Sequence, residues 1–325
     1  MPTSRWNDDV AKPTLMAMLP LYEPAMAALE KDYTLLRPWE AADPAAFIRE
    51  HGAQVRGVVT TTSKGFFREE FDAFPNVEVL ACYGPYLTLL DLGRAHERGI
   101  PVSYTPDSTA APVADLALGL MLAAMRRLPE ADRFVRAGLW PKMAFPAGRE
   151  VHGKRCGIVG MGRIGQQIAR RVAAFDMPVS YYGPRAKPDL PYTYVPDLVA
   201  LAREVDVLIV TCALTSDTRG LVGAEVLDAL GPDGFLVNIS RGPVMDQDAM
   251  IRALAERRIA GAGLDVFNDE PEVPAELMAM DHVVLAPHIG TGTRENRDER
   301  MRKLLANLAA HFAGTPTPYP APEPT

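Results

Sequence analysis

The feature that most constrains the fold of this chain is "KRCGIVGMGRIGQQIARRVAAF", where three glycines at GxGxxG spacing separate an apolar run from an amphipathic one. Gly160 permits a tight turn, Gly162 lets a pyrophosphate approach the backbone, and Gly165 lets a helix pack closely on a strand. The N-terminus of that helix offers free N–H groups to phosphates. The segment predicts a dinucleotide-binding strand, turn and helix. A glycine-rich turn with only a packing role is the alternative.

The rest of the chain alternates short apolar runs with amphipathic segments, in two sets. The first set extends from about Leu15 to Tyr104, and the second begins near Cys156. Such alternation is typical of parallel strands joined by helices. The second set has six apolar runs, which predicts a doubly wound sheet. Because 325 residues exceed what one hydrophobic core usually supports, we expect an α/β protein of two domains.

Three further segments complete this organisation. The most apolar one, "APVADLALGLMLAAMRR", carries Asp115 and is too short for a membrane span, so we expect a buried helix with Pro112 in its first turn. The stretch "RAGLWPKMAFPAGREVHGK" is rich in Gly and Pro, which predicts an extended connection. The Pro-rich tail after about Ala309 is expected to be poorly ordered beyond a final helix.

Composition excludes several classes of protein. The chain is 48% hydrophobic and 23% charged, which is an ordinary globular composition, and its net charge of −7 argues against nucleic-acid binding. The N-terminus lacks the pattern of a secretion signal, and no membrane association is expected. Cys82, Cys156 and Cys212 give neither a disulfide framework nor a zinc spacing. We therefore expect a cytoplasmic protein without a metal site.

The strand after the glycine motif indicates which dinucleotide is bound. NAD-binding sequences place an acidic residue at the end of this strand, where the carboxylate accepts hydrogen bonds from the ribose. Here the strand ends "VSYYGPRAK", with Gly183 at that position and Arg185 and Lys187 just after it. A guanidinium holds a 2′-phosphate, so the sequence favours NADP over NAD. An ordinary solvated loop is the alternative for these two cations.

Three polar residues stand at the ends of the last apolar runs, where open α/β sheets bind ligands. Arg241 follows "FLVNIS", Glu270 follows "GAGLDVFND", and His288 closes "HVVLAPH". Each alone would be unremarkable, but together they suit hydride transfer to a carbonyl. His can give the carbonyl oxygen its proton, a carboxylate keeps the imidazole protonated, and Arg can bind a carboxylate and polarise the carbonyl.

From about Val55 to Arg300 the chain resembles the D-isomer-specific 2-hydroxyacid dehydrogenases, most closely their NADP-dependent glyoxylate/hydroxypyruvate reductase branch. The resemblance rests on "GIVGMGRIG", "NISRGPVMDQDAM", "GAGLDVFNDEP" and "LAPHIGTGTRE". It implies a flavodoxin-like substrate domain of residues 1–104 plus 292–325 and a Rossmann cofactor domain of residues 105–291. It also implies a homodimer, with the arm around Trp140 reaching the neighbouring subunit.

The resemblance implies a role for each site residue. His288 would be the acid/base, Glu270 its carboxylate partner, and Arg241 the substrate clamp and carbonyl polariser. Asp265 would contact the nicotinamide amide, although an Asp there could equally cap the turn before Asn268. The segment "TCALTSDT" would pass beneath the nicotinamide ring. The remaining cofactor contacts would be made by Arg163, Ile164, Pro184, Cys212, Ala213, Thr218, Ile239, Ser240 and Gly290.

One loop departs from the family. Relatives usually read G-V-G-Y-D-N-I-D there and hold the substrate carboxylate with two backbone N–H groups, whereas this chain reads "GPYLTLLD". Gly84 is kept, but Pro85 has no N–H, and Tyr86 replaces a Gly. Either the carboxylate is bound through Arg241, the Tyr86 N–H and Lys64, or the substrate is not glyoxylate or hydroxypyruvate. Lys64 could equally be a solvent-exposed loop lysine.

These residues predict an NADPH-dependent reductase of a small 2-oxo acid. Relatives acting on phosphite or formate share the catalytic trio and remain an alternative, although a preference for NADP speaks against them. A dinucleotide-sensing protein like the corepressors built on this fold is a second alternative from a different class.

Overall fold

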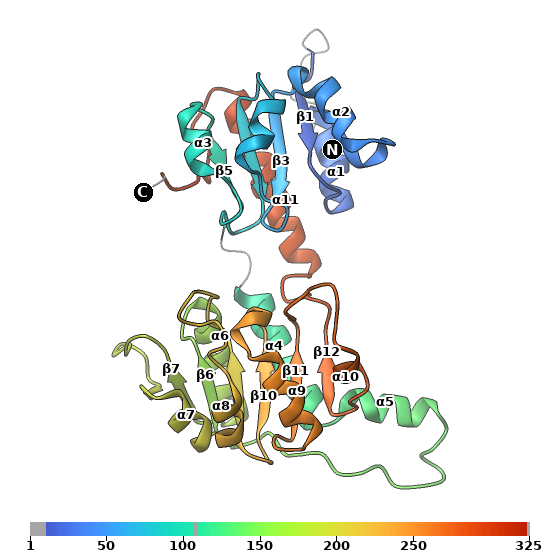
Figure 1. Ribbon diagram of the computed structural model, residues 1–325, viewed down its shortest axis with the longest axis vertical. Coiled ribbons are helices and arrows are strands. Elements are labelled where there is room, and N and C mark those ends of the chain that lie inside the picture. Colours follow the sequence, from blue (N-terminus) through green and yellow to red (C-terminus); the bar gives the residue numbers. More distant parts are fainter. Residues whose placement is uncertain (1–10, 107–109, 324–325) are drawn as a thin grey trace. The chain divides into compact units, whose positions relative to one another are not determined.

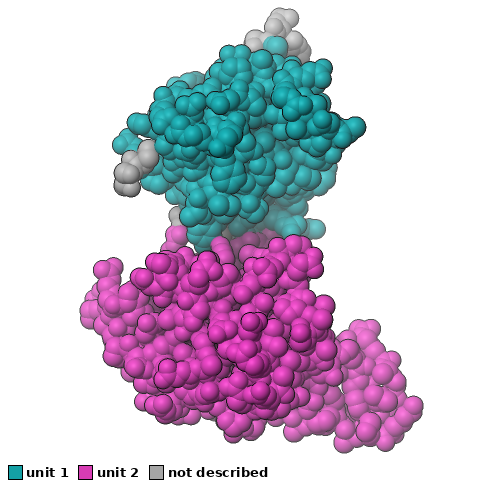
Figure 2. Space-filling model, viewed as in Figure 1, with its two compact units in different colours: residues 1–108, 294–325 teal, residues 109–293 magenta. Residues whose placement is uncertain are grey.

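The computed structural model describes residues 11–106 and 110–323, and the chain divides into two compact units. One unit comprises residues 1–108 and 294–325, and the other residues 109–293 (Figure 2). The chain therefore leaves the first unit and returns to it. The first ten residues, which bear on the expectation of no secretion signal, lie outside the described residues.

The first unit is built on a parallel sheet of five strands in the order β2-β1-β3-β4-β5. All five residues of β4 are buried, because this strand lies inside the sheet and is covered on both faces. The bounds of the strands are β1 Thr14–Ala17, β2 Thr34–Leu36, β3 Gly57–Thr61, β4 Val79–Tyr83 and β5 Val102–Ser103.

Helices cover both faces of this sheet (Figure 1). The last of them, α11, follows the return of the chain and packs on β4 and α1, where Leu304 and Leu308 join Leu15 and Leu29 in one buried cluster. The bounds are α1 Glu23–Asp32, α2 Pro44–His51, α3 Leu92–Glu97 and α11 Arg294–Phe312, with short 3-10 turns η1 Pro38–Glu40, η2 Gly52–Gln54 and η3 Arg68–Ala73.

The Pro-rich tail pairs with the edge of the sheet, so the expectation that it is poorly ordered is wrong for this stretch. The N–H of Tyr104 donates to the carbonyl of Tyr319 at 3.1 Å, and the N–H of Ala321 donates to the carbonyl of Val102 at 2.7 Å. Ser103 and Pro320 form an antiparallel bridge. An edge strand leaves backbone groups unpaired, and the tail satisfies those of β5.

The second unit holds a parallel sheet of seven strands in the order β12-β11-β10-β9-β6-β7-β8 (Figure 1). The order reverses beside β6, as in a doubly wound sheet. This confirms the expected architecture of two parallel-sheet domains. The bounds are β6 Cys156–Val159, β7 Val179–Tyr182, β8 Thr193–Tyr194, β9 Val207–Val210, β10 Phe235–Asn238, β11 Gly261–Leu264 and β12 Val283–Leu285.

Two buried clusters lie on the two sides of this sheet. The predicted apolar helix is α4, and it packs so closely on β11 that a Cβ added at Gly263 would lie 2.8 Å from the Cβ of Leu120. Among the residues that the structure describes, no helix is long and apolar enough to cross a membrane. The bounds are α4 Ala110–Met125, α5 Leu128–Arg136, α6 Arg163–Val172, η4 Ala173–Phe175, α7 Leu198–Glu204, α8 Ala224–Leu230, η5 Gly242–Val244, α9 Gln247–Ala255 and α10 Ala275–Met278.

Candidate active site

The glycine motif forms the turn between β6 and α6, and two of its glycines are required by close contacts. Gly160 has φ 97°, and an added Cβ there would lie 2.8 Å from the backbone of Cys212. At Gly165 an added Cβ would lie 2.3 Å from the carbonyl oxygen of Gly160. At Gly162 an added Cβ would meet nothing within 4 Å, so the backbone is open to a ligand. This cradle fits a pyrophosphate at the N-terminus of α6.

The other predicted cofactor residues of this region lie around the same turn. Arg163 and Ile164 form the start of α6. After β9, the Thr211 hydroxyl donates to the carbonyl of Gly160 at 2.5 Å, which ties the loop of Cys212 and Ala213 to the glycine turn. That loop is closed by the Thr218 hydroxyl, which donates to the Ala213 carbonyl at 2.7 Å and accepts from the Thr215 N–H at 2.7 Å.

Past β7 the chain has no acidic side chain at the strand end. An added Cβ at Gly183 would meet nothing within 4 Å, so the glycine is not required by packing. Pro184 and Arg185 are exposed, and Lys187 is half-buried. The loop therefore presents cations and no carboxylate directly after the strand.

His288 and Glu270 form a hydrogen-bonded pair. The Nδ1 atom of His288 lies 2.6 Å from Oε2 of Glu270. The other carboxylate oxygen, Oε1, accepts the N–H of Phe267 at 3.0 Å, which fixes the orientation of the carboxylate. His288 itself has a left-handed backbone with φ 51°. Such a backbone is sparsely populated outside Gly, and it is held here by the contacts of the loop.

Asp265 holds the loop that carries His288. Its carboxylate is buried and accepts the N–H groups of Ile289 at 2.8 Å and Gly290 at 2.9 Å, while its carbonyl accepts the His288 N–H at 3.0 Å. Burial raises the pKa of Asp265, against the opposing effect of these two N–H donors. The side chain thus caps the loop after β12. The turn at Asn268 is held instead by Gln247, whose Oε1 accepts the Asn268 N–H at 3.1 Å.

Arg241 lies at the end of β10, in the loop that begins η5. Its exposed side chain donates from Nη1 to the carbonyl of Ser240 at 2.6 Å. The loops after β10 and β11 pack closely, since a Cβ at Gly242 would lie 2.1 Å from the Phe267 backbone. Ile239 and Ser240 are buried beside them. Because β10, β11 and β12 are neighbours, the three predicted catalytic residues stand at one edge of the sheet.

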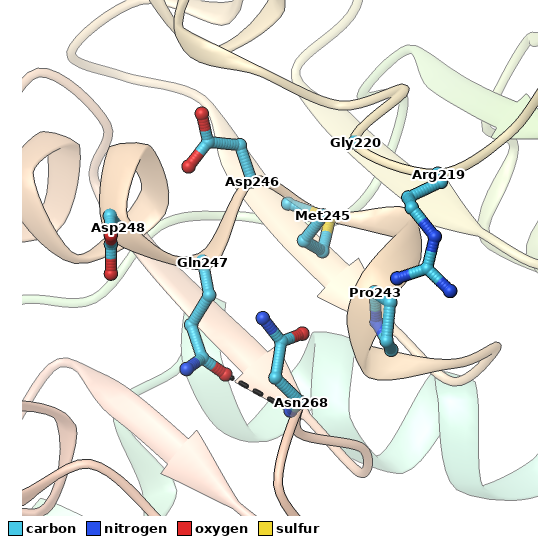
Figure 3. Close-up of a pocket in the computed structure, with 8 residues that line it drawn as sticks. All are labelled: Arg219, Gly220, Pro243, Met245, Asp246, Gln247, Asp248 and Asn268. Atoms are coloured by element: carbon cyan, nitrogen blue, oxygen red, sulfur yellow. Dashed lines mark hydrogen bonds between the residues drawn. The ribbon is translucent and has the colours of Figure 1, made fainter.

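A surface pocket of about 290 Å³ opens at the same loops (Figure 3). None of the three predicted catalytic residues and no residue of the glycine motif lines it. Its lining is mostly polar and comprises Arg219, Gly220, Pro243, Met245, Asp246, Gln247, Asp248 and Asn268. Among residues 11–106 and 110–323 no cluster of three or more His, Cys, Asp or Glu side chains could hold a metal.

The departing loop lies in the first unit, directly after β4. The N–H of Tyr86 donates to the Thr62 hydroxyl at 3.4 Å, and that hydroxyl donates to the Tyr86 carbonyl at 3.1 Å. Thr62 also packs against Gly84, where an added Cβ would lie 2.0 Å from its Oγ1. The one N–H that remains after Pro85 is therefore already engaged. The Tyr86 side chain is 44% exposed.

Lys64 belongs to the neighbouring loop of the same unit. Its Nζ lies 2.7 Å from Oε1 of Glu70 and 6.0 Å from the centre of the Phe67 ring. The lysine is thus half-buried and paired with Glu70.

Several residues that hold the loops described above were not predicted from the sequence. Thr62 fixes the departing loop, and the run "TTTS" at the end of a predicted strand was the signal for it. Tyr181 and Tyr194 hold the loop after β7, and no local pattern identifies them. Arg300 of α11 lies near Tyr83 and Tyr86, and burial lowers its pKa.

Comparison with known proteins identifies the relatives of this chain. The family described as D-isomer specific 2-hydroxyacid dehydrogenase, NAD binding domain, matches residues 118–290. Glyoxylate/hydroxypyruvate reductase A HPR2 of Arabidopsis thaliana is 43% identical, over 92% of this chain and 96% of the relative.

Solved structures with similar folds carry related names. A 2-hydroxyacid dehydrogenase from Ketogulonicigenium vulgare Y25 superimposes with a TM-score of 0.90 at 40% identity, covering 97% of this chain and 99% of that one. The NADPH-dependent glyoxylate/hydroxypyruvate reductase of Sinorhizobium meliloti, solved in complex with NADP and malonate, has a TM-score of 0.84 at 36% identity, covering 96% of this chain and 98% of that one.

Proposed function

The chain belongs to the D-isomer specific 2-hydroxyacid dehydrogenase family, and on that premise we propose that it reduces a small 2-oxo acid to the D-2-hydroxy acid with NADPH. Family membership supports an NAD(P)-dependent oxidoreductase. The observation that carries the proposed chemistry is the 2.6 Å contact between His288 and Glu270 at the sheet edge that also bears Arg241. Glyoxylate and hydroxypyruvate are the proposed substrates.

In this proposal the bound nicotinamide supplies the hydride, and the chain supplies a proton and charge stabilisation. With Nδ1 directed at Glu270, the Nε2–H of His288 donates the proton to the carbonyl oxygen. Glu270 stabilises the charged imidazolium and keeps its ring oriented. Arg241 binds the substrate carboxylate and polarises the carbonyl. Asp265 holds the loop of His288 in place through its two backbone contacts.

The preference for NADPH rests on the loop after β7. A carboxylate at the end of this strand would repel a 2′-phosphate, and Gly183 has none. Arg185 is exposed two residues later and can form charge-assisted hydrogen bonds with a phosphate. Residues 183–187 contain no carboxylate that could accept hydrogen bonds from the unphosphorylated ribose of NADH.

We propose that Arg241 is the main ligand of the substrate carboxylate. The departing loop has lost one N–H donor at Pro85, and the Tyr86 N–H already has a partner in Thr62. Loss of a hydrogen bond to a carboxylate weakens binding by about 1.5–3 kcal/mol, which raises KM without abolishing turnover.

The proposed assembly is a homodimer. The segment 128–145 exposes large apolar side chains, with Trp140 at 70%, Met143 at 58% and Val135 at 54% of their surface. Exposed apolar side chains gathered on one segment favour contact with another protein surface, here a second copy of the chain. Sedimentation equilibrium of the wild type and of Trp140→Ser would test the proposal, and a monomeric wild type would overturn it.

The function is tested by steady-state oxidation of NADPH and NADH in the presence of glyoxylate, hydroxypyruvate or phenylpyruvate. We expect turnover with at least one of these acids and a larger kcat/KM for NADPH. If none of them oxidised either cofactor, the reductase proposal would fail.

A further inference from the structure

Two tyrosine hydroxyls hold the loop that carries Arg185. The N–H of Lys187 donates to the Tyr181 hydroxyl oxygen at 2.6 Å, and the Tyr194 hydroxyl donates to the carbonyl of Gly183 at 3.1 Å. The two contacts lie at Gly183 and Lys187, on either side of Arg185. The segment 183–187 is therefore fixed at both ends, with the guanidinium between them.

The two tyrosines come from adjacent strands and contact each other. Tyr181 of β7 stands opposite Tyr194 of β8 in the parallel register, and their ring centres are 5.4 Å apart. β8 is only two residues long, yet it supplies one of the two contacts. Pairing of this short edge strand with β7 thus brings the second hydroxyl to the loop.

Tyr181 also connects the loop to the cofactor cradle. Its side chain is 1% exposed and belongs to the buried cluster that contains Met161 of the glycine turn and Ile168 of α6. A ring packed in this way has little rotational freedom, so its hydroxyl oxygen is fixed relative to the N-terminus of α6. The position of Arg185 is consequently tied to the site where the pyrophosphate would bind.

We propose that Tyr181 and Tyr194 are positioning residues for the 2′-phosphate of NADPH, which order the segment 183–187 before the cofactor arrives. The inference rests on the proposed preference for NADPH and adds the residues that create it. A loop that is ordered in advance loses less conformational entropy on binding. This lower cost strengthens binding only for a ligand that contacts the loop. NADH, which has no 2′-phosphate for Arg185 to bind, gains little from it.

The test removes each hydroxyl and keeps its ring. The variants are Tyr181→Phe and Tyr194→Phe, and the matched control is Tyr192→Phe, in the same loop. Among the described residues, the Tyr192 hydroxyl has no hydrogen bond. Affinity for 2′,5′-ADP and for 5′-AMP is measured by calorimetry, and kcat and KM are measured with NADPH and NADH. Thermal unfolding of each variant monitors the fold.

We expect each of the two variants to bind 2′,5′-ADP about tenfold more weakly, the size of effect that loss of one hydrogen bond gives. KM for NADPH should rise in parallel, while kcat, 5′-AMP affinity and the control remain as in the wild type. Equal weakening of both nucleotides would show a merely structural role and overturn the inference. Because Tyr181 is buried and Tyr194 is half-buried, a fold defect in one variant leaves the other informative.

The wild type separates the two proposals. If it binds 2′,5′-ADP and 5′-AMP equally, the preference for NADPH and this inference both fail. If it prefers 2′,5′-ADP and both variants keep that preference unchanged, only the role of the tyrosines is refuted.

Discussion

Gly183→Asp should convert the proposed preference for NADPH into a preference for NADH. The substitution restores the carboxylate that NAD-binding relatives carry at the end of this strand. The structure has room for it, because a Cβ at this position meets no atom within 4 Å and the backbone is not left-handed. The contact from Tyr194 is made to the carbonyl of Gly183, so a side chain does not remove it.

The size of the change follows from two effects, one that weakens NADPH binding and one that strengthens NADH binding. At a separation of about 5 Å, repulsion between the new carboxylate and one phosphate charge is about 1–3 kcal/mol for effective dielectric constants of 80 to 20. The exposed neighbours of Gly183 favour the lower value. Hydrogen bonds from the NADH ribose to the carboxylate strengthen NADH binding by about 1.5–3 kcal/mol. Together they shift the ratio of the two kcat/KM values by about a hundredfold.

The assay is the ratio of kcat/KM for NADPH to that for NADH, at one saturating 2-oxo acid. Gly183→Asn is the matched control, because it adds nearly the same volume without the charge. A ratio that changed by less than about threefold in the Asp variant would refute the electrostatic reasoning. An equal change in the Asn variant would assign the effect to steric bulk.

Three further outcomes are expected. Glu270→Gln should lower kcat/KM by about 10- to 100-fold in steady-state assays, because an amide can still accept the Phe267 N–H but does not stabilise an imidazolium. Pro85→Val restores a backbone donor and should lower KM for glyoxylate by up to about tenfold. Burial raises the pKa of Cys212 to about 11, so at pH 8 only about 0.1% is thiolate, and mass spectrometry should find slow alkylation that accelerates as the pH rises toward 11.

Each of these outcomes can be contradicted. Wild-type kinetics in Glu270→Gln would remove the carboxylate from the mechanism. An unchanged KM in Pro85→Val would mean that the departing loop does not restrict the acid substrate. Rapid, complete alkylation of Cys212 in the native protein at pH 8 would show a thiol that burial does not protect.

Strands buried on both faces were predictable from the sequence, because they read as continuous apolar runs. This holds for β4 and β9, all of whose residues are buried. The short edge strands β2 and β8 were missed, since three or two residues give no periodicity. The same limitation hid Tyr194, whose place beside Tyr181 depends on the pairing of β8.

The candidate site was predictable to the extent that it follows from strand ends. Arg241, Glu270 and His288 lie in the loops that follow neighbouring strands, so the order of the sheet brings them to one edge. Contacts that depend on distant segments or on a local turn could not be predicted from the positions of strand ends. Asp265 binds a loop more than twenty residues away, and the pairing of Lys64 with Glu70 depends on the turn η3.

The proposed reaction is most directly tested by hydroxypyruvate reduction in the wild type and in His288→Gln, following NADPH absorbance and the chirality of the product. We expect D-glycerate from the wild type and a loss of about 10²- to 10⁴-fold in kcat/KM for the variant, with NADPH affinity retained. Undiminished turnover by His288→Gln, or an L-product from the wild type, would contradict it.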